Sequence, residues 1–234
     1  MDEIRKIPPV TRVLVGSSLA VTVGAILKFV NPYHVLFSPE LVFSRKLQLW
    51  RLYSSFFLGS GGLQYIFELV MLYQTANDLE SRSYAHRSSD LAWQLLWSSA
   101  AIVGITWPLR PVIFTRAFLV NLVYLYAALA PPGTTTSIMG LLTIPIAYYP
   151  YVLIGFDLLL AGPQAAALSV AGAIVGHGWW WGVWGGGLGS QGVLAQRARA
   201  PEWLRRLMGE TGPRARVGRR RGWRGVGFML RRRG

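Results

Sequence analysis

Residues 165–184 read AAALSVAGAIVGHGWWWGVW and contain no Asp, Glu, Lys or Arg. A helix needs roughly 20 mostly apolar residues to cross a bilayer, because no water inside can satisfy exposed backbone groups. Gly172 and Gly176 lie one turn apart, and small residues at this spacing let two helices approach closely. We therefore predict a membrane-spanning helix that packs inside a bundle through these glycines, with His177 buried and hydrogen-bonded to a neighbouring helix. A pH-sensing or metal-binding role for His177 is the alternative.

Composition extends this interpretation to the rest of the chain. Of its 234 residues, 52% are hydrophobic and only 15% are charged, whereas soluble domains carry about 25% charged residues. Six apolar segments are long enough, or nearly long enough, to cross a membrane: 13–30, 63–75, 91–109, 112–129, 144–160 and 165–184. The second and the fifth are the weakest, because an acid lies in one and two prolines interrupt the other. The sequence therefore predicts an all-α membrane protein with six transmembrane helices.

The segment between the first two spans, residues 31–62, is too apolar for an aqueous loop and too interrupted to cross. Phe43, Leu47 and Trp50 recur at helical spacing on one face, while Arg45 falls roughly opposite. Amphipathic segments of this kind lie in the membrane interface. We predict an interfacial first loop, and a loop that only packs on the bundle is the alternative.

The basic charge is concentrated near the C-terminal end. Residues 190–234 hold 13 arginines and two acids, so they carry +11 of the total charge of +14 and leave +3 for residues 1–189. The positive-inside rule then places both termini in the cytosol. Residues 190–234 are rich in Gly, Arg and Pro and show no pattern of apolar residues that could pack. We therefore predict a transmembrane domain over 1–189 and a mostly disordered cytosolic tail over 190–234. A helical turn at 201–207, on the membrane surface, is the predicted exception.

Residue content excludes several kinds of catalytic site. The absence of Cys excludes Cys-ligated zinc, iron–sulfur clusters and cysteine nucleophiles. A His in the last of six spans is typical of an intramembrane serine protease, which also needs a Ser within reach of that His. The fourth predicted span, 112–129, contains no Ser, and the sequence G-x-S-G is absent from the chain. We therefore predict no catalytic residue, no metal and no cofactor.

Among the polar side chains inside predicted spans, Glu68, Asn121 and Asp157 could line a common cavity. Such residues in membrane helices usually face the bundle interior or a water-filled cavity. One interpretation is a hydrated cavity, open to one leaflet, that engages substrate or lipid. Structural pairing of these groups with neighbouring helices fits the sequence equally well.

Five short segments, taken in order, resemble one protein family. They are Ile7-Pro8-Pro9-Val10-Thr11-Arg12, Leu49-Trp50-Arg51, Leu72-Tyr73-Gln74 with Leu79-Glu80, Tyr148-Tyr149-Pro150-Tyr151-Val152-Leu153-Ile154-Gly155-Phe156, and Gly172-x-x-x-Gly176-His177. Over about residues 7–185 the chain resembles the Derlin family, the rhomboid-like pseudoproteases of endoplasmic-reticulum quality control. The resemblance implies a rhomboid-like bundle of six helices without a catalytic serine. It also implies that Trp50 and Arg51 are important for function.

The tail carries a second resemblance. Residues 222–230, GWRGVGFML, resemble the short box with which Derlins bind the hexameric AAA ATPase that extracts ubiquitylated proteins. The matching residues are Trp223, Gly225, Gly227, Phe228 and Leu230. Aromatic and leucine side chains can fill apolar pockets, while the glycines let the backbone lie flat against a partner. The three arginines that follow the box could instead favour anionic lipid.

Together these resemblances imply a non-enzymatic component of endoplasmic-reticulum-associated degradation, located in the endoplasmic-reticulum membrane. The implied partners are misfolded client proteins, an AAA ATPase of the valosin-containing-protein type, a membrane ubiquitin ligase complex, membrane lipids and further Derlin subunits, but no nucleic acid. Short or interrupted spans would thin the surrounding bilayer and so ease retrotranslocation of clients to the cytosol. An active rhomboid-type protease and a lipid-binding membrane scaffold are the alternatives.

Overall fold

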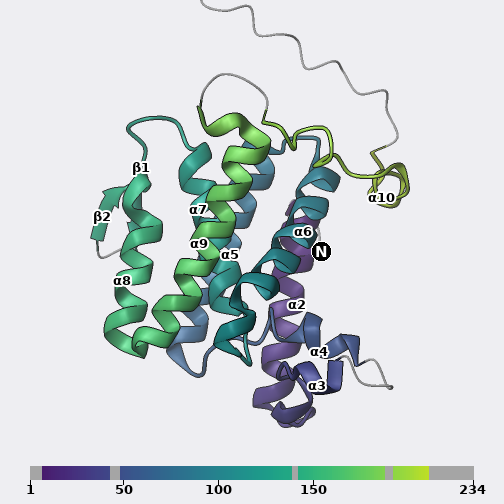
Figure 1. The fold of residues 1–234 in the computed structure, drawn as a ribbon, viewed down its shortest axis with the longest axis vertical. Helices are drawn as coiled ribbons and strands as arrows, with labels where there is room; N and C mark the ends of the chain where they lie inside the picture. Colours follow the sequence, from purple (N-terminus) through teal and green to yellow (C-terminus); the bar gives the residue numbers. More distant parts are fainter. Residues whose placement is uncertain (1–6, 43–47, 139–141, 188–191, 211–234) are drawn as a thin grey trace, which may run out of the picture.

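The computed structural model describes residues 7–42, 48–138, 142–187 and 192–210. Its six long helices coincide with the six apolar segments, and successive long helices run antiparallel (Figure 1). They are α2 (Pro9–Ile26), α5 (Leu63–Asp78), α6 (Ser88–Thr106), α7 (Thr115–Leu129), α8 (Tyr149–Ala161) and α9 (Pro163–Trp184). The predicted helical bundle is therefore present in the described part of the chain.

Length and hydropathy set α2 apart from the other helices. With 18 residues and a mean hydropathy of 1.5, it is the one helix in the described ranges that is long and apolar enough to cross a membrane. Helix α7 has 15 residues and α8 has 13, so both are shorter than the 16-residue α5. The fourth and fifth predicted spans thus give the two shortest of the six long helices, whereas the sequence singled out the second and the fifth as the weakest. Membrane crossing by all six helices stays a prediction.

Helix α2 begins four residues earlier than the apolar segment 13–30, because a distant carboxylate caps it. Pro8 precedes the helix and offers no side-chain hydrogen bond. Instead the buried Glu80 accepts hydrogen bonds from the backbone N–H groups of Val10 (3.0 Å) and Thr11 (2.7 Å) and from the Thr11 hydroxyl (2.8 Å). A carboxylate at this end satisfies free N–H groups and complements the helix dipole. The contact ties α2 to the turn between α5 and α6.

The predicted interfacial loop consists of short helical pieces beside one end of α2 (Figure 1). These are η1 (Pro32–His34), α3 (Pro39–Val42) and α4 (Leu49–Ser54). Phe43, Arg45 and Leu47, which carry part of the predicted apolar and polar faces, lie outside the described residues. Trp50 on α4 exposes 56% of its surface. An exposed tryptophan suits the headgroup region of a bilayer.

A two-stranded hairpin precedes α8 and corrects the all-α prediction. Strand β1 (Thr135–Ile138) pairs antiparallel with β2 (Leu142–Pro145), with Thr135 opposite Pro145. A turn of 3₁₀-helix, η4 (Ile146–Tyr148), then leads into α8. The predicted fifth span, 144–160, therefore starts its α-helix five residues late. Proline lacks the backbone N–H that a helix interior needs, so it is confined to the start of α8.

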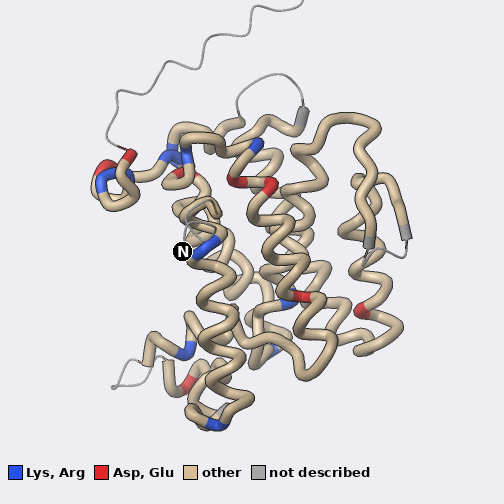
Figure 2. The backbone as a smooth tube through the Cα atoms, turned by 180° about the vertical axis from the view of Figure 1, so that it is seen from behind, with Lys and Arg blue, Asp and Glu red and all other residues tan. Residues whose placement is uncertain are grey.

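Helix α7 is the centre of the bundle. Its residues 117–123 are all buried, which means that this helix is covered on every side. Helices α5, α8 and α9 pack around it, and α9 makes the most extensive contact. Figure 2 shows few charged residues along the helices, with most of them toward the ends of the bundle or on the segment that leads to the C-terminus. Buried apolar side chains therefore dominate the interior.

The segment 192–210 packs on the N-terminal end of α6, so the prediction of disorder from residue 190 is wrong for this part of the tail. The Ala200 N–H donates to Asp90 Oδ1 at 2.8 Å, and the Ser89 N–H donates to Glu210 Oε1 at 3.0 Å. Free N–H and carboxylate groups in the first turn of α6 supply these partners, which tail composition does not reveal. The helical turn predicted at 201–207 is present as α10 (Glu202–Leu207), and its place on the membrane surface stays a prediction.

Polar and aromatic side chains also join α6 to the end of α9. The Trp179 indole donates to Gln94 Oε1 at 2.8 Å, the Tyr84 hydroxyl donates to the same oxygen, and the Trp184 indole donates to the Tyr84 hydroxyl at 3.3 Å. Burial raises the pKa of Tyr84, so the phenol keeps its proton and remains a donor. These bonds fix the end of the bundle from which the tail departs.

Candidate functional site

Arg51 holds the first loop together from inside. Its side chain is 6% exposed. Nη1 donates to the backbone carbonyls of Tyr33 (2.6 Å) and Leu36 (3.2 Å), and Nε donates to the Gln48 side chain (2.5 Å). A guanidinium offers five N–H donors, which suits it to collecting carbonyls of an irregular backbone. The side chain of the adjacent Trp50 is exposed instead. The two residues therefore have different structural roles.

A buried ion network joins three helices through Arg116, the second residue of α7. Nε and Nη2 of Arg116 lie 2.6 and 2.5 Å from Asp157 Oδ1 on α8. Nη1 of Arg116 lies 3.5 Å from Glu68 Oε1 on α5. Both carboxylates are buried, at 6% exposure for Glu68 and 4% for Asp157. One guanidinium therefore bridges the two helices that flank α7.

Hydroxyl groups complete the coordination of both carboxylates. Ser169 of α9 donates to Asp157 Oδ2, while Ser60 donates its N–H (3.0 Å) and its hydroxyl (2.7 Å) to Glu68. Buried charges are tolerated when they are paired and hydrogen-bonded in this way. The network thus links α5, α7, α8, α9 and the loop before α5. The contacts of Glu68 and Asp157 are therefore those of structural pairing with neighbouring helices, which is one of the two interpretations left open by the sequence.

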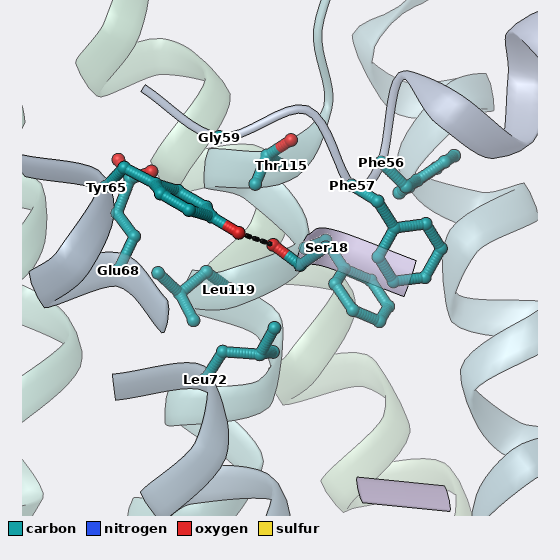
Figure 3. A pocket seen from close by; sticks show the side chains of 10 residues that line it. Ser18, Phe56, Phe57, Gly59, Tyr65, Glu68, Leu72, Thr115 and Leu119 are labelled. Carbon is teal, nitrogen blue, oxygen red and sulfur yellow. Dashed lines mark hydrogen bonds between the residues drawn. The ribbon is translucent and has the colours of Figure 1, made fainter. Parts of the chain in front are cut away.

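A small cavity lies beside Glu68 (Figure 3). Its volume is about 10 Å³, which is close to the room needed by one water molecule. Tyr65 crosses it and shares a 3.3 Å hydrogen bond with Ser18 of α2. Neither Asn121, which is 2% exposed within α7, nor Asp157 lines this cavity. The three polar residues predicted to share one hydrated cavity are therefore not brought together around it.

Gly172 and Gly176 lie where α9 meets α7. A Cβ atom at Gly172 would overlap the backbone carbonyl of Ala117. A Cβ atom at Gly176 would lie 2.9 Å from Tyr124 Cβ and 3.1 Å from the Asn121 carbonyl oxygen. Both distances are shorter than ordinary contacts, so only glycine permits this approach of the two helices.

His177 is exposed on the surface of α9, so the prediction that it is buried is wrong. Its predicted bond to a neighbouring helix is present, because Nδ1 lies 2.6 Å from the Tyr124 hydroxyl of α7. Gly176 and His177 are adjacent, and their side-chain directions diverge by about 100° on a helix. Because Gly176 faces α7, the adjacent His177 lies at the edge of the contact between α9 and α7. The hydroxyl that His177 meets is a phenol and not a serine.

Sequence reasoning missed Arg116 and Glu80 as organising residues. Arg116 opens a helix whose neighbours each carry one acid within an apolar stretch, and this combination was the available signal. Glu80 gave a weaker signal, since its partner Val10 lies 70 residues away in the chain. The tail residues Trp223, Gly225, Gly227, Phe228 and Leu230 lie outside the described residues.

With this geometry established, comparison with known proteins gives the family. A sequence model of the Der1-like family matches residues 7–181. The chain belongs to the Der1-like family. The matched range contains the first loop, the Arg116 network and the glycines of α9, and it ends before the C-terminal tail.

Derlins of plants are among the similar proteins. The chain is 30% identical to Derlin-2.2 of Zea mays over 185 residues, which cover 74% of this chain and 73% of the relative. It is 29% identical to Derlin-2.1 of Arabidopsis thaliana over 188 residues, covering 75% of each. For Derlin-1 of Arabidopsis thaliana, the identity is 28% over 175 residues, covering 73% of this chain and 64% of the relative.

Proposed function

We propose that this Der1-like protein is a non-catalytic retrotranslocation factor of the endoplasmic-reticulum membrane. Membership of the family supports a role in endoplasmic-reticulum-associated degradation in general. In the proposed role, the bundle receives misfolded proteins and eases their passage to the cytosol, and both termini lie on the cytosolic side. Membrane thinning and recruitment of an AAA ATPase are the two physical steps.

The observation that carries the thinning step is the shortness of α7 and α8. At about 1.5 Å per residue, the 15 and 13 residues of these helices extend only about 22 and 20 Å. Ordinary hydrocarbon is roughly 30 Å thick. A bilayer adapts to short hydrophobic elements by thinning around them. A thinner hydrocarbon layer lowers the free-energy barrier that a polar peptide meets when it crosses the membrane.

Thinning requires that the short helices cannot separate or move past each other. The Arg116 network fixes α7 against α5 and α8, with bonds of 2.5 and 2.6 Å to Asp157. Gly172 and Gly176 bring α9 into backbone contact with α7. Packed helices of this kind form a rigid body, so the lipid must adapt to the protein.

In this proposal Trp50 and Arg51 have different roles in the first loop. Arg51 binds the carbonyls of Tyr33 and Leu36 and so holds the loop in one conformation. Trp50 remains exposed and would anchor the loop at headgroup depth. The rigid loop therefore sets the depth at which the bundle sits.

In this proposal the tail carries out the second step, which is recruitment of an AAA ATPase. Residues 222–230 would bind the AAA ATPase, and the docked segment 192–210 would hold the start of the tail against α6. Clients, a membrane ubiquitin ligase complex and further Derlin subunits complete the proposed assembly. Lipid is the remaining partner.

An active rhomboid-type protease is the competing function, and the contact between His177 and Tyr124 argues against it. A catalytic histidine must take a proton from a serine hydroxyl. His177 instead has the phenol of Tyr124 at 2.6 Å. A lipid-binding scaffold is the third function; it predicts no effect of the bundle on client turnover.

Client half-life in cells lacking the endogenous protein tests the proposal. Wild-type chain should restore rapid degradation of a misfolded client, and Trp50→Ala should leave the client stabilised. His177→Ala should restore degradation like the wild type, because no proton transfer is involved. Loss of function in His177→Ala, with peptide cleavage by purified wild type, would establish the protease instead. Equal client half-lives with and without the protein would favour the scaffold.

A further inference from the structure

An open hollow of about 470 Å³ lies between the first loop and the connection that joins α6 to α7. The segment from Tyr33 to Leu41 forms one wall, and residues 110–112 form the other. The walls are joined by a hydrogen bond from the Phe37 N–H to the Val112 carbonyl at 2.9 Å. The hollow is therefore preformed by segments that are far apart in sequence.

The charge that lines the hollow is entirely positive. Arg51 and Arg110 are among its ten lining residues, and none of the ten is an acid. Among the described residues, Arg51 donates to two carbonyls and to Gln48, which are neutral partners and do not cancel its charge. Two guanidiniums at a partly enclosed site favour a bound anion, and the planar fork of arginine matches phosphate.

Arg110 has a strained backbone at this place. Its φ is 47° and its ψ is 51°, in the left-handed region, and Pro111 follows it. A side chain with a Cβ atom disfavours this conformation, and a following proline disfavours it further. Glycine would fit without strain. Residues with such backbone angles cluster at functional sites, and this one supplies a cation to the lining of the hollow.

Exposed apolar and aromatic side chains lie at the hollow and close to it in sequence. Tyr33 and Val112, which line the hollow, expose 77% and 51% of their surface, and Trp107, three residues before Arg110, exposes 49%. Rings of this kind favour the headgroup region, and an aliphatic rim suits acyl chains. An isolated inorganic anion would leave this rim in contact with water. A phospholipid carries both a phosphate for the guanidiniums and acyl chains for the apolar rim.

We propose that the hollow binds the headgroup of a membrane phospholipid, with the phosphate at Arg110 and Arg51 and the acyl chains along the exposed rim. The inference rests on the proposed membrane location of the chain. The bound lipid has a zwitterionic headgroup, because the exposed ring of Tyr33 can attract its quaternary ammonium group. Lipid held here fixes the depth of the first loop.

Native mass spectrometry of the purified full-length chain with dioleoylphosphatidylcholine tests this site. Arg110→Lys keeps the charge and should retain the lipid. Arg110→Gly removes the charge and relieves the backbone, so it should weaken lipid binding about tenfold or more without lowering the unfolding temperature. Lys28→Gly is the matched control, since Lys28 also has a positive φ (58°) but does not line the hollow. It should bind lipid like the wild type.

Three outcomes would overturn the inference. Equal lipid retention by Arg110→Gly and the wild type would show that the hollow holds no headgroup. Displacement of the lipid by inorganic phosphate would assign the site to a free anion. Failure of both the wild type and Lys28→Gly to retain any lipid would also contradict the proposed membrane location. Lost lipid binding with normal client turnover would leave the proposed function standing.

Discussion

Arg51 and Arg116 show two ways of keeping a guanidinium inside an apolar protein. Arg51 is held by neutral carbonyls of an irregular loop, and Arg116 by two carboxylates from different helices. The sequence marked Arg51 through its Trp-Arg motif, but it could not reveal the partners of either arginine. The carbonyl and carboxylate partners lie 15 to 48 residues away and are brought close only by the fold.

Loss of Arg51 should destabilise the protein much more than loss of its neighbour. Arg51→Ala leaves the carbonyls of Tyr33 and Leu36 without a donor, so we expect the free energy of unfolding to fall by about 2–4 kcal/mol. Trp50→Ala removes an exposed ring and should change it by less than about 0.5 kcal/mol. Denaturant unfolding in detergent measures both. Similar losses in the two variants would contradict this assignment of roles.

Arg116→Met should be among the most damaging single substitutions in the bundle. It leaves Glu68 and Asp157 without their cation, and an uncompensated buried charge costs about 3–5 kcal/mol. The triple variant Arg116→Met, Glu68→Gln, Asp157→Asn should recover much of that stability, because no ion remains. Thermal unfolding in lipid nanodiscs compares them. A triple variant no more stable than Arg116→Met would refute the network as a set of compensating charges.

At the scale of elements, the apolar segments located all six long helices, whereas capping groups and prolines decided where α2 and α8 begin. Glu80 caps α2 from a distance, and the prolines around α8 delay its start. The hairpin of β1 and β2 escaped prediction because residues 130–143 fall between two predicted spans, and only the last two residues of β2 lie in the predicted span 144–160. Residues 192–210 escaped because their order comes from bonds to α6 and not from their composition.

The contact between α7 and α9 gives a prediction with an internal control. Gly172→Ala places a methyl group on the Ala117 backbone, which cannot yield as a flexible side chain would. We expect a loss of about 1–3 kcal/mol or more in unfolding free energy, as for other overpacked sites. Gly178→Ala on the same helix meets no atom within 4 Å and should be neutral or slightly stabilising, since alanine favours helix. Equal effects in a chemical unfolding series would contradict the proposed close approach.

At the scale of the whole molecule, the chain combines a rigid bundle with an arginine-rich tail whose start is docked on α6. Family and fold class followed from ordered motifs spread over the bundle. The site was less predictable, because its Arg116 network depends on which helices become neighbours. The unequal charge of body and tail predicted orientation, and it also predicts where a cytosolic ATPase would attach.

Trp223→Ala should reduce co-purification of the AAA ATPase from native membranes. The aromatic ring is the largest apolar group of the proposed box, and such anchors carry most of the binding energy of short motifs. We expect a loss of at least about fivefold in bound ATPase. Trp203→Ala, at an exposed tryptophan of α10, is the control and should bind normally. A comparable loss in both variants would indicate a general effect of the tail.

The central claim is that a rigid bundle with short helices adapts the bilayer to itself. Its 10 tryptophans allow lipid preference to be measured directly, by fluorescence quenching with brominated phosphatidylcholines of increasing chain length. We predict that the reconstituted protein binds short-chain lipids more tightly than dioleoyl lipid. Strongest binding to chains that match a hydrocarbon core of roughly 30 Å would contradict the account.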